Sequence, residues 1–236
     1  MQKPNEKQGA EKSPTVGESI NEFIQKNRNY IFILGASIIV ILFAVIAAFS
    51  LMDFFRNRAI AAVEDFYGRY EEMLPSITED YSQDDVSSFI DELTVFAKKN
   101  SGYPGGRAWL IIGGIHTAKN EWAEAEAAYA KAAKSAGRTY LAPLAWFNAA
   151  AAAEEQNKTT EAIDYYGNSL TATAVFSSAP RAQFSIGRLH ETLNEDEKAI
   201  EAYRAVISNW PYDQVWTNLA RSRIITLETK TGSEKE

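Results

Sequence analysis

One stretch of the sequence, residues 30–52, limits the possible folds more than any other feature. Its 23 residues, YIFILGASIIVILFAVIAAFSLM, include no charged side chain. As an α-helix the stretch would be about 34 Å long, enough to cross the hydrocarbon core of a bilayer. A buried core helix is the first alternative, but such a helix is rarely apolar on every face over this length. The stretch therefore predicts a transmembrane helix.

A cleaved signal peptide is the second alternative for residues 30–52. Signal peptides begin with a short basic segment, and their apolar stretch is about 7–15 residues long. Here a polar segment of 29 residues comes first and the apolar stretch is longer, although Ala47, Ala48 and Ser50 leave a cleavage site open. These lengths favour an uncleaved anchor with a single span.

The polar segment at residues 1–29 is expected to be a tail with a short helix next to the membrane. Residues 1–19 are polar and contain two prolines and two glycines, which is typical of a disordered chain. Ile20, Phe23 and Ile24 follow at helical spacing between charged residues, which indicates a helix lying on the membrane surface. A simple polar flank is an equally good interpretation of these three residues.

The charge of the chain is acidic and unevenly distributed. Residues 1–29 carry a net charge of +1, so the remaining residues carry −8 of the total of −7. Two basic residues flank each end of the span, Lys26 and Arg28 before it and Arg56 and Arg58 after it. Under the positive-inside rule this balance favours a cytoplasmic N-terminus only slightly. An acidic chain without clustered Lys and Arg argues against nucleic acid as a partner.

Residues 53–105 are expected to form a helical hairpin. Apolar residues spaced by three and four mark one face of a helix at about residues 54–74, namely Ile60, Val63, Tyr67, Tyr70 and Leu74. A matching stripe marks a second helix at about residues 84–100, namely Val86, Phe89, Leu93 and Phe96. Pro75 ends the first helix, and the polar loop after it favours an antiparallel pair. Strand-like alternation is found nowhere in the sequence.

The rest of the chain repeats itself every 37 residues. Three positions show this period most clearly: Gly113, Ala150 and Gly187; Ala125, Ala162 and Ala199; and Tyr129, Tyr166 and Tyr203. A small residue is needed where two helices approach closely, and a large aromatic residue fills the hole beside it. The pattern therefore predicts stacked pairs of helices.

These residues resemble the tetratricopeptide repeat family, in which each unit of about 34 residues is a helix, a turn and a second helix. The first copy begins with Trp109 and Gly113, and the second begins with Trp146 and Ala150. The third copy closes with Pro211, which stops its second helix. The resemblance covers residues 107–225.

Together with the predicted span and hairpin, the resemblance implies an all-α fold, with one N-terminal transmembrane helix followed by a helical hairpin, three repeats and a capping helix. The repeats and their cap occupy residues 106–228, the cap lying at about residues 213–228. Residues 229–236 are expected to be a disordered tail. Gly137 and Ala174 stand where the family has a closing proline, so irregular turns are expected there.

The resemblance also implies a protein-binding groove along the first helices of the repeats. Carried over position by position, its residues are Arg107, Leu110, Phe147, Glu154, Arg181, Phe184, Arg188, Glu191 and Arg221. Leu110, Phe147 and Phe184 share one repeat position and would form an exposed apolar ladder in an open array. In the alternative, the hairpin at residues 54–100 or the final helix folds over them.

The sequence offers little for catalysis. His116 and His190, the two histidines, hold the same repeat position and would lie about 20 Å apart, too far to share a metal ion. The absence of cysteine excludes disulfides, thiolate metal sites and a cysteine nucleophile. Adjacent acids such as Glu154 and Glu155 point in different directions on a helix. We expect no catalytic, metal or cofactor site, no small-molecule substrate and no enzymatic activity.

A polar tail, one span and a short acidic repeat domain together resemble the membrane-anchored ancillary subunit of the bacterial Sec translocon. That resemblance implies an inner-membrane protein anchored in the lipid bilayer by residues 30–52, with a cytoplasmic N-terminus and a periplasmic repeat domain. Its partners would be the translocation channel and periplasmic chaperones or exported chains. Some repeat proteins hold chaperone C-termini in a clamp, of which only Asn148 and Arg181 fit here. The alternative is a scaffold for envelope or cell-division assemblies, bound through its convex face or through Ala44 and Ala48 in the span.

Overall fold

The structure, a computed structural model, describes residues 15–77, 82–171 and 176–233. Every regular element in these residues is a helix and none is a strand, which confirms the predicted all-α fold. The chain divides into two compact units, Met1–Phe55 and Arg56–Glu236. Helix α1, Val16–Met73, contributes residues to both units.

In the first unit, α1 contains the apolar stretch. Among the described residues it is the one helix long and apolar enough to cross a membrane, and the most apolar part of it is not buried by the rest of the chain. The predicted juxtamembrane helix, the span and the first helix of the hairpin are one uninterrupted element. No proline occurs between residues 18 and 73, so every residue of this stretch has a backbone N–H to donate to the helix.

The predicted disordered tail is only partly tested by the structure. Residues 16–19 belong to α1, so the prediction is wrong for them. Thr15 lies directly before α1, and its backbone N–H donates to the Glu18 carboxylate (2.8 Å), which provides a hydrogen-bond partner at the start of the helix. Residues 1–14 lie outside the described residues.

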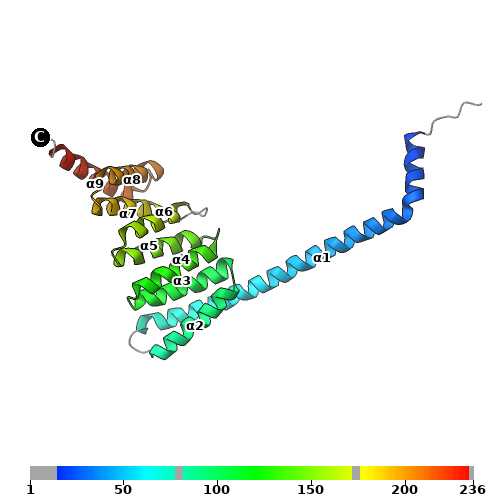
Figure 1. The fold of residues 1–236 in the computed structure, drawn as a ribbon, viewed down its shortest axis with the longest axis horizontal. Coiled ribbons are helices and arrows are strands. Elements are labelled where there is room, and N and C mark those ends of the chain that lie inside the picture. The colour runs from blue at the N-terminus through cyan, green and yellow to red at the C-terminus, as the bar shows by residue number, and fades with distance from the viewer. Residues whose placement is uncertain (1–14, 78–81, 172–175, 234–236) are drawn as a thin grey trace, which may run out of the picture. The chain divides into compact units, whose positions relative to one another are not determined.

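In the second unit, helices stack in chain order, and from α2 (Gln83–Lys99) to α9 (Gln214–Ser233) each contacts the next (Figure 1). A 3₁₀ turn at Leu74–Ser76 follows α1. The later helices are α2 (Gln83–Lys99), α3 (Gly102–Ala118), α4 (Trp122–Ala136), α5 (Leu141–Glu155), α6 (Thr159–Thr171), α7 (Ala179–Thr192), α8 (Asp196–Asn209) and α9 (Gln214–Ser233). The C-terminal part of α1 pairs with α2, and the next three pairs, α3 with α4, α5 with α6 and α7 with α8, are the three repeats.

Helix α9 is longer than the sequence predicted. It reaches Ser233, so the expected disordered tail at residues 229–236 is wrong for residues 229–233, and residues 234–236 lie outside the described residues. Leu227 is buried, and the Lys230 Nζ atom lies 2.9 Å from an Asp196 carboxylate oxygen at the start of α8. These contacts hold the end of α9 against its neighbour.

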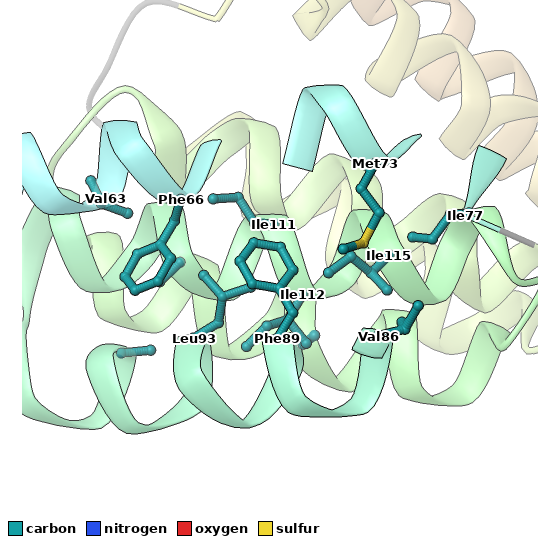
Figure 2. Close-up of a cluster of buried hydrophobic side chains, with 13 residues drawn as sticks. Val63, Phe66, Met73, Ile77, Val86, Phe89, Leu93, Ile111, Ile112 and Ile115 are labelled. Atoms are coloured by element: carbon teal, nitrogen blue, oxygen red, sulfur yellow. The ribbon is translucent and has the colours of Figure 1, made fainter. Parts of the chain in front are cut away.

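Figure 2 shows the core that joins the hairpin to the first repeat. Val63 and Phe66 of α1, Phe89 and Leu93 of α2, and Ile112 of α3 belong to one buried cluster. Full burial of each such side chain stabilises the fold by about 1.5–3 kcal/mol. The hairpin is therefore packed onto the repeats as a further helical pair of the second unit.

The repeat positions meet as the pattern predicts. A Cβ atom added to Gly113 would lie 2.5 Å from the Tyr129 ring, and one added to Gly187 would lie 2.6 Å from the Tyr203 ring. Such distances are shorter than any carbon contact, so these helices pack at a separation that only glycine permits. In the second repeat, fully buried Ala150 belongs to the same cluster as Tyr166.

A repeated turn, which the sequence analysis missed, joins the two helices of each repeat. Three asparagines at the 37-residue period lie in the left-handed region: Asn120 (φ 57°), Asn157 (φ 60°) and Asn194 (φ 57°). In the first turn the Asn120 N–H donates to the Thr117 carbonyl (3.0 Å) and the Glu121 N–H to the His116 carbonyl (2.9 Å). This is a Schellman C-cap, with asparagine in the position that glycine usually occupies.

The second helices of the repeats end in different ways. Helix α4 ends at Ala136, and Gly137 follows with a φ of 60° where the family has a closing proline. Helix α8 ends at Asn209, directly before Trp210 and Pro211. Ala174, the other departure from the family, lies outside the described residues.

Replacing Gly187 by alanine tests the close approach of α7 and α8. We expect Gly187→Ala to lower the free energy of unfolding by about 1–3 kcal/mol, because the new Cβ atom would overlap the buried Tyr203 ring. Gly167→Ala in α6 is the matched control: its Cβ would meet nothing within 4 Å, and it should raise stability by up to about 1 kcal/mol. Urea unfolding of the full chain in detergent micelles measures both, and equal effects would contradict the packing argument.

Candidate protein-binding groove

Three hollows follow the first helices of the stacked pairs and share their lining residues. The first, of about 140 Å³, and the second, of about 170 Å³, are both lined by Tyr129 and Asn148. The second and the third, of about 330 Å³, are both lined by Ala151 and Glu155. Neighbouring hollows therefore adjoin one another, and we call the row of three the inner groove, which lies along the C-terminal part of α1 and along α3, α5, α7 and α9.

The first hollow contains two of the predicted groove residues, Arg107 and Leu110. The Arg107 side chain is 17% exposed, its Nε atom lies 3.4 Å from a Glu64 carboxylate oxygen, and its guanidinium lies 4.0 Å from the centre of the Tyr67 ring. Arg107 thus ties α3 to α1. Leu110 is half-buried and packs against α4 and α5 residues such as Ala133.

The expected exposed ladder of Leu110, Phe147 and Phe184 is not present. Phe147 is only 7% exposed, because its ring packs edge-on against Tyr166 (5.2 Å between ring centres) and Phe176 (5.7 Å). Tyr166 lies in α6, and Phe176 lies between α6 and α7. Neither residue belongs to the hairpin or to the final helix, the two segments that were expected to cover Phe147.

Phe184 is half-buried for a different reason. Its ring lies 5.0 Å from that of Tyr203 in its own repeat and 5.4 Å from that of Trp216 in α9. The final helix therefore covers one side of Phe184, as the second interpretation of the sequence expected, while Phe184 and Trp216 still line the third hollow.

Two predicted groove acids are held in matching side-chain networks. The Tyr166 hydroxyl donates to Glu154 (2.7 Å), and Arg188 of the next repeat forms an ion pair with the same carboxylate. The second network, one repeat later, joins three residues in the same way: Tyr203, Glu191 and Arg223 of α9. Each carboxylate thereby links one first helix to the next.

The first repeat lacks this network. Thr117 stands where the later repeats have a glutamate, and its hydroxyl lies 3.0 Å from the Tyr129 hydroxyl. The tyrosine therefore keeps a polar partner, but α3 has no carboxylate and α5 has no arginine to form the ion pair of the later repeats. The link between α3 and α5 depends on packing instead, and this part of the groove is lined by uncharged Tyr129 and Asn148.

The networks leave a smaller set of polar groups available to a partner. Asn148 lines the first two hollows, and its amide makes no hydrogen bond to any residue that the structure describes. Arg181 is exposed, lines the third hollow and touches the Phe147 ring at 5.2 Å. Arg221 is exposed on α9 and lines none of the three hollows.

Several lining residues were missed by the sequence analysis. Tyr67 and Tyr70 were assigned only to a packing stripe, and Tyr129 only to a repeat core position, yet all three border the first hollow. Their aromatic character in a predicted stripe was the available signal. Arg223 breaks the 37-residue period, so no repeat pattern could have paired it with Glu191.

Among the described residues the histidines and acids do not gather into a metal site. No group of three or more His, Asp or Glu side chains in the described ranges could hold a metal ion. The Nδ1 atom of His116 lies 2.6 Å from Glu121, and that of His190 lies 2.7 Å from Glu195. Each histidine thus bridges the turn between the helices of its repeat.

Antiparallel helix pairs with a small residue facing a tyrosine define the second unit as a helical-repeat structure of the tetratricopeptide type. Residues 118–171 and 168–214 match the tetratricopeptide repeat family. The chain is also 34% identical over 131 residues to a TPR repeat-containing protein of Treponema pallidum (strain Nichols), over 56% of this chain and 54% of that protein. It thus spans about half the length of that relative. Both findings support a tetratricopeptide-repeat protein, and such repeats indicate a protein–protein interaction module that is generally non-enzymatic.

Glu191→Gln tests the network at the end of the groove. Burial alone would raise the pKa of Glu191, but hydrogen bonds from Arg223 and Tyr203 outweigh burial and hold this pKa below 4.5. The stabilisation from ionised Glu191 is therefore complete above pH 4.5 and is lost as the pH falls through the lowered pKa. We expect Glu191→Gln to cost about 1–3 kcal/mol at pH 7 and to remove this part of the acid dependence.

Glu228→Gln is the matched control for this substitution. Glu228 pairs with Arg204 at 3.0 Å, but both side chains are more than half exposed, so its loss should cost less than about 1 kcal/mol. Urea unfolding curves of the full chain between pH 3 and pH 7 provide the measurement. Parallel pH profiles for Glu191→Gln and the unmodified protein would contradict the role of the network.

Proposed function

We propose that this protein is a membrane-anchored protein-binding module whose inner groove holds an extended segment of a partner polypeptide. The row of three adjoining hollows on both sides of Asn148 carries this proposal. Three hollows in a row suit a chain-like ligand better than a compact one, and they border a side-chain amide without a partner among the described residues. An amide both donates and accepts hydrogen bonds, so it matches the backbone of a bound peptide.

The charges along the groove indicate what kind of segment it accepts. Glu154, Glu191 and Arg188 already neutralise one another or neighbouring groups, whereas Arg181 has no carboxylate partner among the described residues. Arg181 is thus available to a carboxylate or carbonyl oxygen of the ligand, and half-buried Phe184 beside it offers apolar contact. A segment with an apolar residue next to an acidic one fits this end of the groove.

We further propose that the module is ancillary to the protein translocation machinery of a bacterial inner membrane and links it to periplasmic chaperones or exported chains. The order of the parts supports this, with one candidate span followed by acidic repeats. The N-terminus would be cytoplasmic and the repeats periplasmic. A scaffold for envelope or cell-division assemblies has the same order of parts but would bind through other surfaces.

Photo-cross-linking in native membranes tests the groove. A photo-reactive residue in place of Ala151, which lines the groove, should capture a partner, whereas one in place of Ala127, exposed on α4, should not. Combining Asn148→Ala with Arg181→Ala should lower capture at least tenfold, since about 1.4 kcal/mol of lost binding suffices for that factor. Arg138→Ala is the charge-matched control, because Arg138 lines none of the hollows.

Two outcomes would reject the groove as the binding site. One is equal capture from Ala151 and Ala127. The other is capture from positions in the span alone, which would favour the scaffold.

Protease accessibility tests the orientation. In intact spheroplasts, an added protease should degrade the repeat domain, because the proposal places residues 56–236 on the outer side of the inner membrane. A cytoplasmic marker protein should stay intact in the same sample. Degradation only after the spheroplasts are lysed would place the domain in the cytoplasm.

A further inference from the structure

The first and second repeats each place an indole against their own second helix. Trp109 of α3 lies beneath Lys131 of α4, with the Nζ atom 4.7 Å from the ring centre. Trp146 of α5 stacks on Tyr165 of α6, with 5.6 Å between ring centres and 19° between ring planes. The two tryptophans are 37 residues apart, so they fill the same place in successive repeats, which we call the tryptophan slot.

The third repeat lacks every large residue of this slot. Gln183 replaces the tryptophan, Ala202 stands where the second repeat has Tyr165, and Ala205 stands where the first repeat has Lys131. The structure has a hollow of about 260 Å³ at this place between α7 and α8, lined by these three residues and by Ile186, His190 and Lys198 among others. The two helices are adjacent in Figure 1.

The third slot is a separate surface from the inner groove. It shares no lining residue with the three hollows of the groove. Gln183 only reaches across one side of it, where its amide donates to the Ala202 carbonyl at 3.3 Å. Its volume is below the roughly 300–1,000 Å³ of small-molecule sites, so it suits one side chain better than a whole ligand.

The lining chemistry matches an indole. Ile186 and Ala202 provide apolar walls, and exposed Lys198, whose Nζ atom lies 2.9 Å from a Glu195 carboxylate oxygen, provides a cation that can lie over an aromatic face, as Lys131 does on Trp109. An indole N–H needs an acceptor, and the Glu201 carboxylate lines the hollow without an ion pair to any described residue. Within this chain, the same position twice holds a tryptophan, so the backbone geometry already accommodates one.

We propose that the third tryptophan slot binds a tryptophan side chain presented by a partner polypeptide. The slot is an anchor on a different face from the inner groove, so it would add a second point of contact to a bound protein. The partner's tryptophan would fill the place that Trp109 and Trp146 fill in the first two repeats.

The two histidines can report whether a tryptophan binds in the third slot. His190 lines the open slot, while His116 holds the same position in the first repeat, where Trp109 fills the slot. The full chain, labelled on its histidine side chains and held in detergent micelles, is titrated with N-acetyl-tryptophanamide and followed by NMR. The His190 ring signals should shift and saturate with a dissociation constant on the order of 1 mM, and those of His116 should stay in place. N-acetyl-alaninamide should shift neither.

Two substitutions close the slot in different ways. Gln183→Trp fills it with the residue of the other repeats, and Ala205→Leu fills it from the half-buried side. Each should abolish the His190 response, so the test still holds if one of them does not fold. Combining Asn148→Ala with Arg181→Ala should leave that response intact, which separates the slot from the groove. No shift of His190, equal shifts of both histidines, or an unchanged response in both filled variants would overturn the proposal.

Discussion

The close approach of paired helices at glycine is the contact on which the rest of the second unit depends. Gly113 and Gly187 let the rings of Tyr129 and Tyr203 lie against the helix backbone. At that depth the tyrosine hydroxyl reaches the last turn of the first helix, where Thr117 in one repeat and Glu191 in another bind it. In these two repeats a single steric fact, the missing Cβ atom, thus sets the spacing of the helix pair and places a polar group at the edge of the groove.

That polar group then determines how one repeat joins the next. Glu154 and Glu191 each hold an arginine from the following first helix, so the tyrosine that packs one pair also orders the link to its neighbour. Once these charges are satisfied, few polar groups remain for a ligand. Asn148, Glu155 and Arg181 line the groove, and the packing network makes no use of their hydrogen-bonding groups. The groups available to bind a partner are therefore those that do not take part in the contacts between repeats.

Two departures from the repeat pattern, the hairpin and the third repeat, shape the hollows of the second unit. The hairpin of α1 and α2 takes the place of a preceding helix pair and borders the first hollow through Tyr70, which packs closely on Gly114. The third repeat keeps the glycine and the tyrosine but loses the tryptophan, and an open slot results. In a repetitive molecule, a filled copy indicates what an open copy could accept, because both positions belong to the same kind of helix pair.

The sequence alone determined the features that depend on spacing along one helix. The uncharged stretch at residues 30–52 and the all-α fold follow from local periodicity, and the 37-residue repeat predicted that a small residue such as Gly187 and an aromatic residue such as Tyr203 lie where two helices meet. Tertiary structure decided the rest. The burial of Phe147 depends on Phe176, which comes after the second helix of its repeat. The ion-pair partner of Glu191 is Arg223, which does not follow the 37-residue period. Which side chains lie exposed and which charges are already paired depends on neighbours distant in sequence, so only the packed chain could show them.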